Sequence, residues 1–346
     1  MKNIMVTGNL GYIGLVLTDR LASKGYNVIG YDIGYYEGCE IERFVSRVSR
    51  QIRKDIREVD SADLKDVDAI VHLAALSNDP LGEFDPNLTD QINRDGTIRL
   101  AELAKARGVQ RFIYSSSQSM YGIAKSDEEL DEDRSEKNPI TAYARTKWEA
   151  ECGLKELGTN DFLTVCLRPS TVFGVSPRLR CDIVFNNLVA CAYTKGRIEV
   201  KSDGTPWRPV VHIQDVCSAY IAGLEAPAAI VAGRSFNVGI KNGNYTVREL
   251  AEAAGQAVPG SSVVFTGEHG KDSRTYKVGF TRILTELRDY YKPEWDLRKG
   301  GRELVELFKR INFTEDMFQG RSCNRLLQLK HLIKEKYIDQ SLKLVK

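Results

Sequence analysis

A tyrosine and a lysine one helical turn apart are the residues of this chain best equipped for chemistry. Tyr143 and Lys147 share one face of any helix that contains both. A free phenol titrates near ~10, and a neighbouring ammonium or a cationic ring favours its ionised form. The pair therefore predicts a group that accepts a proton from a hydroxyl. Taken alone, such a pair also recurs by chance in lysine-rich helices, and that alternative stays open.

A run of hydroxyl side chains strengthens this hypothesis. Residues 115–122 read Ser-Ser-Ser-Gln-Ser-Met-Tyr-Gly and follow an apolar strand pattern at 111–115. In doubly wound sheets, ligands bind at the carboxyl ends of parallel strands. A hydroxyl at this place can hydrogen-bond a reacting oxygen. A plain polar junction between strand and loop is the alternative interpretation.

A glycine-rich turn near the start of the chain predicts a dinucleotide site. Gly8, Gly11 and Gly14 follow a strand pattern and precede a helix pattern, which is the context such a turn requires. Glycines permit a tight turn and close approach to a pyrophosphate, and the helix N-terminus favours the anion. The spacing differs from the usual Gly-x-Gly-x-x-Gly, so an ordinary strand-to-helix turn is the alternative.

Asp32 specifies the dinucleotide further. It ends the second strand pattern, where a carboxylate can accept hydrogen bonds from both ribose hydroxyls and would repel a 2′-phosphate. No Arg or Lys follows it in the next several positions to offset that repulsion. The sequence therefore predicts NAD rather than NADP. The alternative is a solvated carboxylate in a loop.

The elements that must position these residues alternate along the first half of the chain. Apolar strand patterns near 4–6, 27–32, 69–73, 111–115 and 163–167 are separated by helix patterns. Continuous apolar strands separated by helices indicate a parallel sheet covered on both faces. We expect an α/β fold: a Rossmann-type doubly wound parallel sheet with a smaller C-terminal α/β substrate-binding domain.

The pattern loosens after Arg168-Pro169, where prolines punctuate the chain. We expect the NAD-binding domain over 1–168 with a returning segment at about 208–232. The remaining ranges form the substrate-binding domain, at 169–207 and 233–313, and a Leu- and Lys-rich helical tail at 314–346.

Composition narrows the classes of partner. The 346 residues carry a net charge of +2, so neither nucleic acid nor a membrane surface is expected as a partner. No apolar run approaches the roughly 20 residues of a membrane span, and the N-terminus shows no signal-peptide pattern. Seven scattered cysteines indicate reduced thiols in a cytoplasmic protein. Neither they nor the four histidines have metal-ligand spacing, so no metal site is expected.

Taken together, these residues resemble the extended short-chain dehydrogenase/reductases, in the nucleotide-sugar epimerase/dehydratase branch. The likeness covers about residues 1 to 310. It depends on ordered motifs: Thr7–Gly14, Asp55-Ile56-Arg57, His72-Leu73-Ala74-Ala75, Asn93 with Gly96-Thr97, Met120-Tyr121-Gly122, Tyr143 with Lys147, Arg168-Pro169, and Arg208-Pro209-Val210-Val211-His212 with Asp215.

The resemblance implies roles. Tyr143 would be the acid/base, Lys147 would hold the nicotinamide ribose and tune Tyr143, and Ser117 would be the hydroxyl donor. The implied NAD-binding residues are Gly8, Leu10, Gly11, Tyr12, Ile13, Gly14, Asp32, Asp55, Ile56, Leu73, Ala74, Ala75, Asn93, Ser115, Tyr143 and Lys147.

For the substrate, a nucleotide-diphosphate sugar, the resemblance implies a second group. Asn187 matches the position that grips the diphosphate, and Arg208 and Arg274 match the arginines that clamp it, as bidentate guanidinium groups do. The implied residues on the sugar side are Ser117, Gln118, Ser119 and Thr171.

The chain also departs from the branch. Where 4,6-dehydratases of the branch carry Asp-Glu, this chain has Gln118 and Ser119, which disfavours ordinary 4,6-dehydration. Thr171 stands where Asn is frequent, Pro209 where Asp is usual, and the tail after about Thr314 exceeds the common length.

The hypothesis that accommodates these features is a cytoplasmic NAD-dependent nucleotide-sugar 4-epimerase acting by transient oxidation at carbon four. An atypical dehydratase or a keto-sugar reductase of the same family is the first alternative. A non-catalytic NAD-binding regulator is the second. The resemblance also implies a homodimer formed through the helix that carries Tyr143 and the neighbouring segment 93–105.

Overall fold

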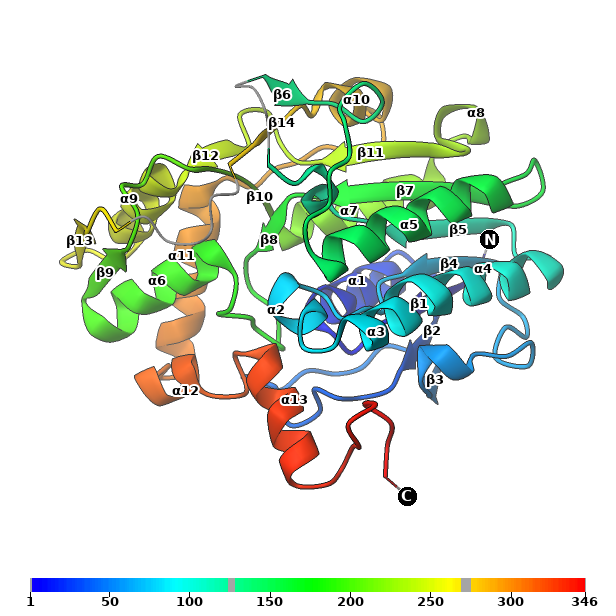
Figure 1. Cartoon of the computed structure of the whole chain (residues 1–346), viewed down its shortest axis with the longest axis horizontal. Coiled ribbons are helices and arrows are strands. Elements are labelled where there is room, and N and C mark those ends of the chain that lie inside the picture. Colours follow the sequence, from blue (N-terminus) through cyan, green and yellow to red (C-terminus); the bar gives the residue numbers. More distant parts are fainter. Residues whose placement is uncertain (1, 124–127, 269–274, 346) are drawn as a thin grey trace.

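The computed structural model of the chain describes residues 2–123, 128–268 and 275–345. Its central feature is a parallel sheet of seven strands in the order β11-β7-β5-β4-β1-β2-β3 (Figure 1). The strands are β1 (Asn3–Thr7), β2 (Asn27–Asp32), β3 (Arg50–Arg53), β4 (Ala69–His72), β5 (Arg111–Ser115), β7 (Leu163–Pro169) and β11 (Arg234–Val238).

Helices cover both faces of this sheet because successive strand residues point in opposite directions. On β1, Ile4 and Val6 join one apolar cluster, whereas Met5 joins another. The first cluster lies under α1 (Tyr12–Ser23) and α7 (Ile213–Glu225), and the second lies under α4 (Gly96–Ala106) and α5 (Ala142–Leu157). The expected doubly wound α/β fold is therefore confirmed (Figure 1).

Short elements connect these layers. At the carboxyl edge of the sheet they are η1 (Ile56–Glu58), α2 (Asp79–Gly82), α3 (Pro86–Thr89), the π-helical η2 (Asp90–Asp95) that continues into α4, and η3 (Gln118–Tyr121), whereas α8 (Ala228–Val231) lies at the amino edge, before β11.

A smaller set of sheets and helices forms the rest of the molecule, as expected for a second, C-terminal α/β region. Its strands are β6 (Glu129–Leu130), β8 (Thr171–Phe173), β9 (Arg197–Val200), β10 (Trp207–His212), β12 (Asn244–Thr246), β13 (Ser262–Phe265) and β14 (Lys277–Val278). They form the sheets β12-β10-β8, β13-β9 and β14-β6. Their helices are α6 (Val184–Lys195), α9 (Val247–Ala257), α10 (Thr281–Glu286) and α11 (Leu297–Arg310).

The chain returns to the large sheet slightly later than the range 208–232 suggests. β10 pairs with β8 and β12 of the smaller region, so residues 207–212 do not take part in the return. The returning elements are α7, which packs under β5 and β7, and β11, which pairs with β7. The strand at 234–238 lies in the range assigned to substrate binding because its apolar run is short, and only its pairing partner identifies it.

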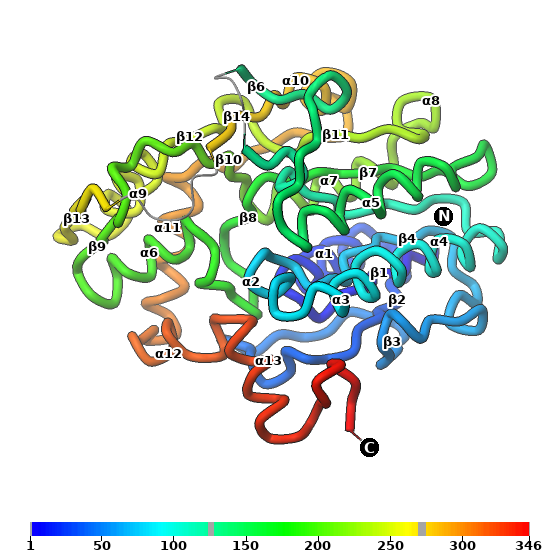
Figure 2. Tube along the Cα trace, viewed as in Figure 1, coloured from blue at the N-terminus to red at the C-terminus, as the bar shows by residue number. Residues whose placement is uncertain are grey.

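The C-terminal tail is helical only in part. It contains α12 (Glu315–Gln319) and α13 (Arg325–Lys334), and then folds back so that Ile338 bridges Leu344. Leu329 and Leu342 are fully buried in the apolar cluster under α4 and α5. Figure 2 shows the tail running back along the N-terminal segments that follow β2. No helix within the described ranges is long and apolar enough to cross a bilayer.

Candidate active site

A cleft at the carboxyl ends of the parallel strands gathers most of the residues singled out from the sequence. It opens between the large sheet and the smaller region, and β8 and the 180–183 segment supply its far wall. The predicted residues that line it are Gly8, Gly11, Tyr12, Ile13, Gly14, Asp32, Asp55, Ile56, Leu73, Ala74, Ala75, Ser115, Ser117, Gln118, Ser119, Tyr143, Lys147 and Thr171.

The glycine turn at one side of the cleft tolerates no side chains. Gly8 has a φ of +70°, and a Cβ there would lie 2.8 Å from the backbone nitrogen of Ala74. A Cβ on Gly14 would lie 2.1 Å from the carbonyl oxygen of Gly8. No side chain caps α1, so its N-terminus is left for an anion. The turn therefore has the form of a pyrophosphate cradle.

Asp32 lies beside this turn at the end of β2. Its carboxylate accepts hydrogen bonds from the backbone N–H of Leu10 at 3.1 Å and of Gly34 at 2.7 Å. Burial raises the pKa of Asp32, and these two backbone donors partly oppose that rise. The carboxylate is thus fixed in place while still lining the cleft, as an acceptor for ribose hydroxyls requires.

Asp55 and Ile56 form the next part of the wall. Asp55 caps η1 through the backbone N–H of Arg57 and also pairs with the Arg57 guanidinium at 2.5 Å. Both residues are nearly fully buried and line the cleft on the side of Asp32. A flat, apolar edge with a fixed acceptor suits an adenine ring.

Tyr143 stands at the other end of the cleft, in the first turn of α5. The hydroxyl of Thr141 caps this helix by accepting from the N–H of Ala144 at 3.2 Å. Burial raises the pKa of Tyr143 to about 12, and its hydrogen bond with the Ser117 hydroxyl opposes part of that rise. Phenol and hydroxyl therefore meet at one point of the cleft.

Lys147 reaches the same end from one turn further along α5. Its ammonium donates to the carbonyl of Ser115 at 2.6 Å and lies 4.9 Å from the centre of the Tyr114 ring. Burial lowers the pKa of Lys147 to about 7. Burial dominates the pKa of Tyr143 in the protein alone, and Lys147 is not among the largest influences on it, so the role of Lys147 in making the phenol acidic stays a prediction.

A buried ion pair under the serine run holds this end together, and no motif in the sequence singled out its acid. Glu151 of α5 pairs with Arg168 of β7 at 2.5 Å, and both side chains are fully buried. The same carboxylate accepts from Ser116 and from Ser235, each at 2.6 Å. Three strands and α5 are thereby tied to one acid.

Gln118 and Ser119 occupy the positions that decide the chemistry after the hydroxyl residue. The Gln118 amide donates to the carbonyl of Arg168 at 3.0 Å and accepts from the Ser170 hydroxyl at 3.1 Å. The backbone of Ser119 donates to the Ser117 oxygen at 3.1 Å. Neither side chain titrates in the range of an acid or a base, and the Gln118 amide is committed to the protein.

Two residues assigned to the cofactor do not line the cleft. The backbone N–H of Leu10 donates to Asp32 at 3.1 Å, and its carbonyl accepts from the Arg178 guanidinium. Asn93 is buried, and its amide accepts from the backbone of Leu76 at 2.8 Å and donates to the carbonyl of the same residue at 3.1 Å. Asn93 therefore fixes the loop after β4, which the resemblance could not distinguish from direct binding.

The residues assigned to the substrate diphosphate lie apart from the cleft lining. The Asn187 amide donates to the carbonyl of Cys181 at 2.9 Å, and the Arg208 guanidinium donates to the carbonyl of Trp207 at 2.9 Å. Neither residue lines the cleft in the part of the chain that the structure describes. Arg274 lies outside the described residues.

The cleft contains cations and rings that sequence reasoning missed. Arg180 is bound to Asp182 at 2.8 Å and to Ser77 at 3.1 Å, within a charged run that follows β8 and could have been noticed. The other missed lining residues include Tyr35, Tyr36, Tyr276 and Arg325. Arg325 belongs to the C-terminal tail, and no motif signals it.

Comparison with known proteins places this arrangement in a family. A family model described as the NAD dependent epimerase/dehydratase family matches residues 4–239. UDP-glucuronic acid decarboxylase 1 of Arabidopsis thaliana is 27% identical over 327 residues, which cover 92% of this chain and 72% of that protein. UDP-glucose 4-epimerase of Mycolicibacterium smegmatis is 29% identical over 317 residues, covering 88% and 98%.

A solved structure agrees. UDP-glucuronic acid 4-epimerase from Bacillus cereus, in complex with UDP-glucuronic acid and NAD, matches with a TM-score of 0.76 at 25% identity. The match covers 89% of this chain and 99% of that one. The similar proteins thus include both epimerases and decarboxylases.

Proposed function

This chain belongs to the NAD dependent epimerase/dehydratase family, and from that membership we propose that it is a nucleotide-sugar 4-epimerase. Its cofactor is NAD, and enzymes of its kind act on nucleotide-sugars. The observation that carries the finer proposal is the meeting of the Tyr143 phenol and the Ser117 hydroxyl in a cleft where positions 118 and 119 offer no second acid or base.

The residues of the cleft fit NAD. The glycine turn has no room for side chains and leaves a helix N-terminus for the pyrophosphate, Asp32 is held as a ribose acceptor, and Asp55 with Ile56 suits the adenine. When bound in its oxidised form, NAD supplies an acceptor for the hydride that leaves carbon four of the sugar. It also supplies a positive charge that favours the phenolate of Tyr143.

The protein's own groups would handle the proton. Tyr143 takes the proton of the 4-hydroxyl, and Ser117 hydrogen-bonds the same oxygen so that it faces the phenol. Lys147, held against the Ser115 carbonyl, orients the ribose beside Tyr143. After the keto-sugar rotates in the cleft, its other face would recover at carbon four the hydride held by the cofactor, and Tyr143 would return the proton to the oxygen of the inverted carbon.

Water elimination requires more than this. A 4,6-dehydratase must also remove a proton from carbon five and deliver one to the leaving hydroxyl, which calls for titratable groups next to the hydroxyl residue. Gln118 cannot titrate, and its amide is committed to Arg168 and Ser170. The arrangement therefore favours epimerisation over an ordinary 4,6-dehydration.

The test is incubation of the purified enzyme with a panel of nucleotide-sugars, beginning with UDP-linked hexoses and uronic acids, with products analysed by mass spectrometry and NMR. A product of unchanged mass and inverted carbon four supports the proposal. A product lighter by one water or by one carbon dioxide, or stoichiometric consumption of NADH, would replace it with a dehydratase, a decarboxylase or a reductase. Tight NAD binding with no turnover of any sugar would indicate a regulator.

We further propose that two copies associate through α4 and α5. In the structure, these helices lie side by side on one face of the sheet, and an ion pair at 3.0 Å between Arg94 of η2, which leads into α4, and Glu149 of α5 links the two segments. Size-exclusion chromatography with light scattering measures the state directly, and a monomer at micromolar concentration contradicts the proposal.

A further inference from the structure

Arg325, the first residue of α13, is a buried cation without an acid. It is 2% exposed, and its Nη1 atom has no hydrogen-bond partner. Across residues 2–123, 128–268 and 275–345, no carboxylate forms an ion pair with it. Its hydrogen-bond partner is the carbonyl of Arg178, which accepts from Nη2 at 2.9 Å, and its guanidinium lies 4.3 Å from the centre of the Tyr36 ring.

The carboxylates nearby are already committed. Asp182 is bound by Arg180 at 2.8 Å, and Glu40 is bound by Arg178 at 2.5 Å. A guanidinium remains protonated in a protein, and burying a charge without a counter-ion is unfavourable. An anion supplied from outside the chain would offset that cost.

The position of Arg325 identifies which anion. It lines the cleft together with Tyr36, which follows Asp32 by one short loop. Through the backbone of Arg178, it is linked to the glycine turn, because the Arg178 guanidinium donates to the carbonyl of Leu10. Arg325 thus borders the space between the glycine turn and the loop after Asp32.

We propose that the Arg325 guanidinium binds a diphosphate in the cleft that it lines, and that this diphosphate is the pyrophosphate of NAD. A guanidinium and a phosphate oxygen form a charge-assisted hydrogen bond, the class of contact that this side chain lacks among the residues described. The inference depends on the cofactor of the family and not on the sugar that is converted. Its failure would therefore leave the proposed epimerase activity untouched.

The rest of the tail holds the same side of the cleft. Gln328 donates to the carbonyl of Tyr35 at 3.0 Å, the Tyr35 hydroxyl donates to the carbonyl of Leu342, and Arg57 donates to the carbonyl of Ser341 at 2.9 Å. We call residues 325–342 the C-terminal clasp. It joins the loop after β2 to η1, which are the two segments on either side of the proposed adenosine site.

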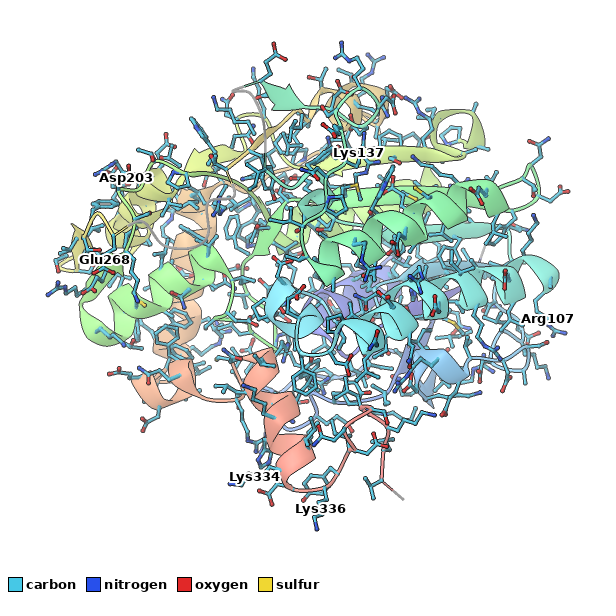
Figure 3. All side chains as sticks on the ribbon, viewed as in Figure 1. Arg107, Lys137, Asp203, Glu268, Lys334 and Lys336 are labelled. Carbon is cyan, nitrogen blue, oxygen red and sulfur yellow. The ribbon has the colours of Figure 1, made fainter. Side chains whose placement is uncertain are left out.

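The experiment compares the wild type, Arg325→Met and the control Arg107→Met in the full-length chain stripped of nucleotide. Arg107 is exposed at the end of α4, far from α13 in Figure 3. Calorimetry measures dissociation constants for NAD, ADP, adenosine and UDP. Because one charge-assisted hydrogen bond is lost, Arg325→Met should bind NAD and ADP about 10- to 100-fold more weakly than the wild type. Its affinity for adenosine and for UDP should be unchanged. Arg107→Met should bind all four as the wild type does.

Equal affinity of Arg325→Met and wild type for NAD and ADP overturns the proposal. If Arg325→Met binds UDP more weakly than the wild type but binds ADP equally well, the assignment to the cofactor is overturned and the contact belongs to the diphosphate of the substrate. The melting temperature separates binding from mere tail docking. Removing an unpaired buried charge should leave the nucleotide-free protein as stable or more stable, and reduce the increase in melting temperature that NAD produces. A lower melting temperature without nucleotide and an unchanged NAD increment would mean that Arg325 only docks the tail.

Arg325→Lys covers the case in which the methionine variant does not fold. It keeps the charge but loses the planar fork, so NAD affinity should fall to a value between the wild type and the expectation for Arg325→Met. If Arg325→Lys binds NAD as tightly as the wild type and retains all of its NAD through gel filtration, a directed guanidinium contact is contradicted.

Discussion

At the end of the cleft lined by Ser117 and Tyr143, the side chains come from the loop that follows β5 and from α5, which packs on the same sheet. At the end lined by Tyr36 and Asp55, the wall is completed by the C-terminal clasp, nearly three hundred residues further along the chain. We call these the phenol end and the clasp end. The first is built from the sheet itself, whereas the second is an added layer.

The difference shows in how charge is buried. At the phenol end, the Arg168 guanidinium meets Glu151, and two serines satisfy the same carboxylate. At the clasp end, Arg325 is buried with no such acid among the residues described. A complete pair keeps a site rigid without a ligand, whereas an incomplete one leaves part of the binding energy to the ligand. The two ends should therefore respond differently to substitution.

The largest effect is expected from removing the phenolic oxygen. Tyr143→Phe should lower kcat about 10³-fold, because acid/base catalysis is lost while the packing of the ring is retained. NAD content and the melting temperature should stay at wild-type values, since the clasp end is unaffected. Steady-state kinetics measure kcat, and the absorbance of the NAD released by precipitating the protein measures its NAD content. Tyr290→Phe, at a partly exposed tyrosine, is the control. Full turnover in Tyr143→Phe would rule out the assigned acid/base.

Breaking the buried pair at the phenol end comes next. Glu151→Gln leaves Arg168 buried without its charge partner and should lower the free energy of unfolding by about 3 to 4 kcal/mol. Urea denaturation measures this difference. Glu156→Gln, on the exposed side of the same helix, should change the free energy by less than about 0.5 kcal/mol. Equal stability of the two variants would contradict a structural role for the pair.

The same carboxylate predicts a pH dependence of stability. Burial alone would raise the pKa of Glu151, but the charge of Arg168 outweighs it and lowers the pKa from 4.5 to about 2. A depressed pKa means that the folded state binds the proton less readily than the unfolded state. The stabilisation is therefore complete above pH ~4.5 and is lost as the pH falls towards ~2, by about 3 kcal/mol in all. The free energy of unfolding of Glu151→Gln should change less with pH over that range than that of the wild type.

At the clasp end, a core substitution should open the tail without touching the phenol end. Leu329→Ala removes a fully buried side chain of α13 and should weaken docking of the clasp by about 2 to 3 kcal/mol. Limited proteolysis should then cut near α13, and NAD should dissociate faster, with the pH profile of turnover unchanged. Leu327→Ala, 42% exposed on the same helix, is the control. If proteolysis cuts the tail no faster in Leu329→Ala than in the control, the clasp is not held by this contact.

The smallest effect tests one hydrogen bond of the clasp. Tyr35→Phe removes the donor to the Leu342 carbonyl and should favour opening of the tail by about 1 kcal/mol. Hydrogen exchange of the backbone near residues 338–344 should accelerate several-fold. Tyr337→Phe, 61% exposed, should leave that exchange unchanged. The figure of the side chains shows Lys334 and Lys336 at the outer end of α13, where substitutions to alanine provide further surface controls (Figure 3).

The two ends also differ in how far the sequence predicted them. Periodicity predicted the doubly wound sheet, since its strands are apolar on both faces and are joined by helices. The glycine turn, Asp32 and the Tyr143–Lys147 spacing predicted a cleft in which these residues do lie together. All of these signals are local in sequence and depend on backbone geometry that a few residues determine.

What the sequence did not predict depends on contacts between distant segments. The apolar run of β11 is too short to identify without its partner β7, and nothing in the tail marks Arg325 as a cleft residue. The dominance of burial over the pKa of Tyr143 was not predicted either, because the spacing of two residues says nothing of how deeply both are buried, and the effect of Lys147 on the phenol stays a prediction. The roles of Asn187 and Arg208 stay predictions.

The late arrival of β11 has a consequence for how the nascent chain acquires its structure. Until residues 234–238 leave the ribosome, β7 is an unpaired edge, and the carboxylate of Glu151 lacks the hydroxyl of Ser235. An exposed parallel edge invites association between chains. The whole smaller region up to that strand must therefore be synthesised before the nucleotide-binding half can close, so a fragment that stops after β7 should aggregate rather than fold independently.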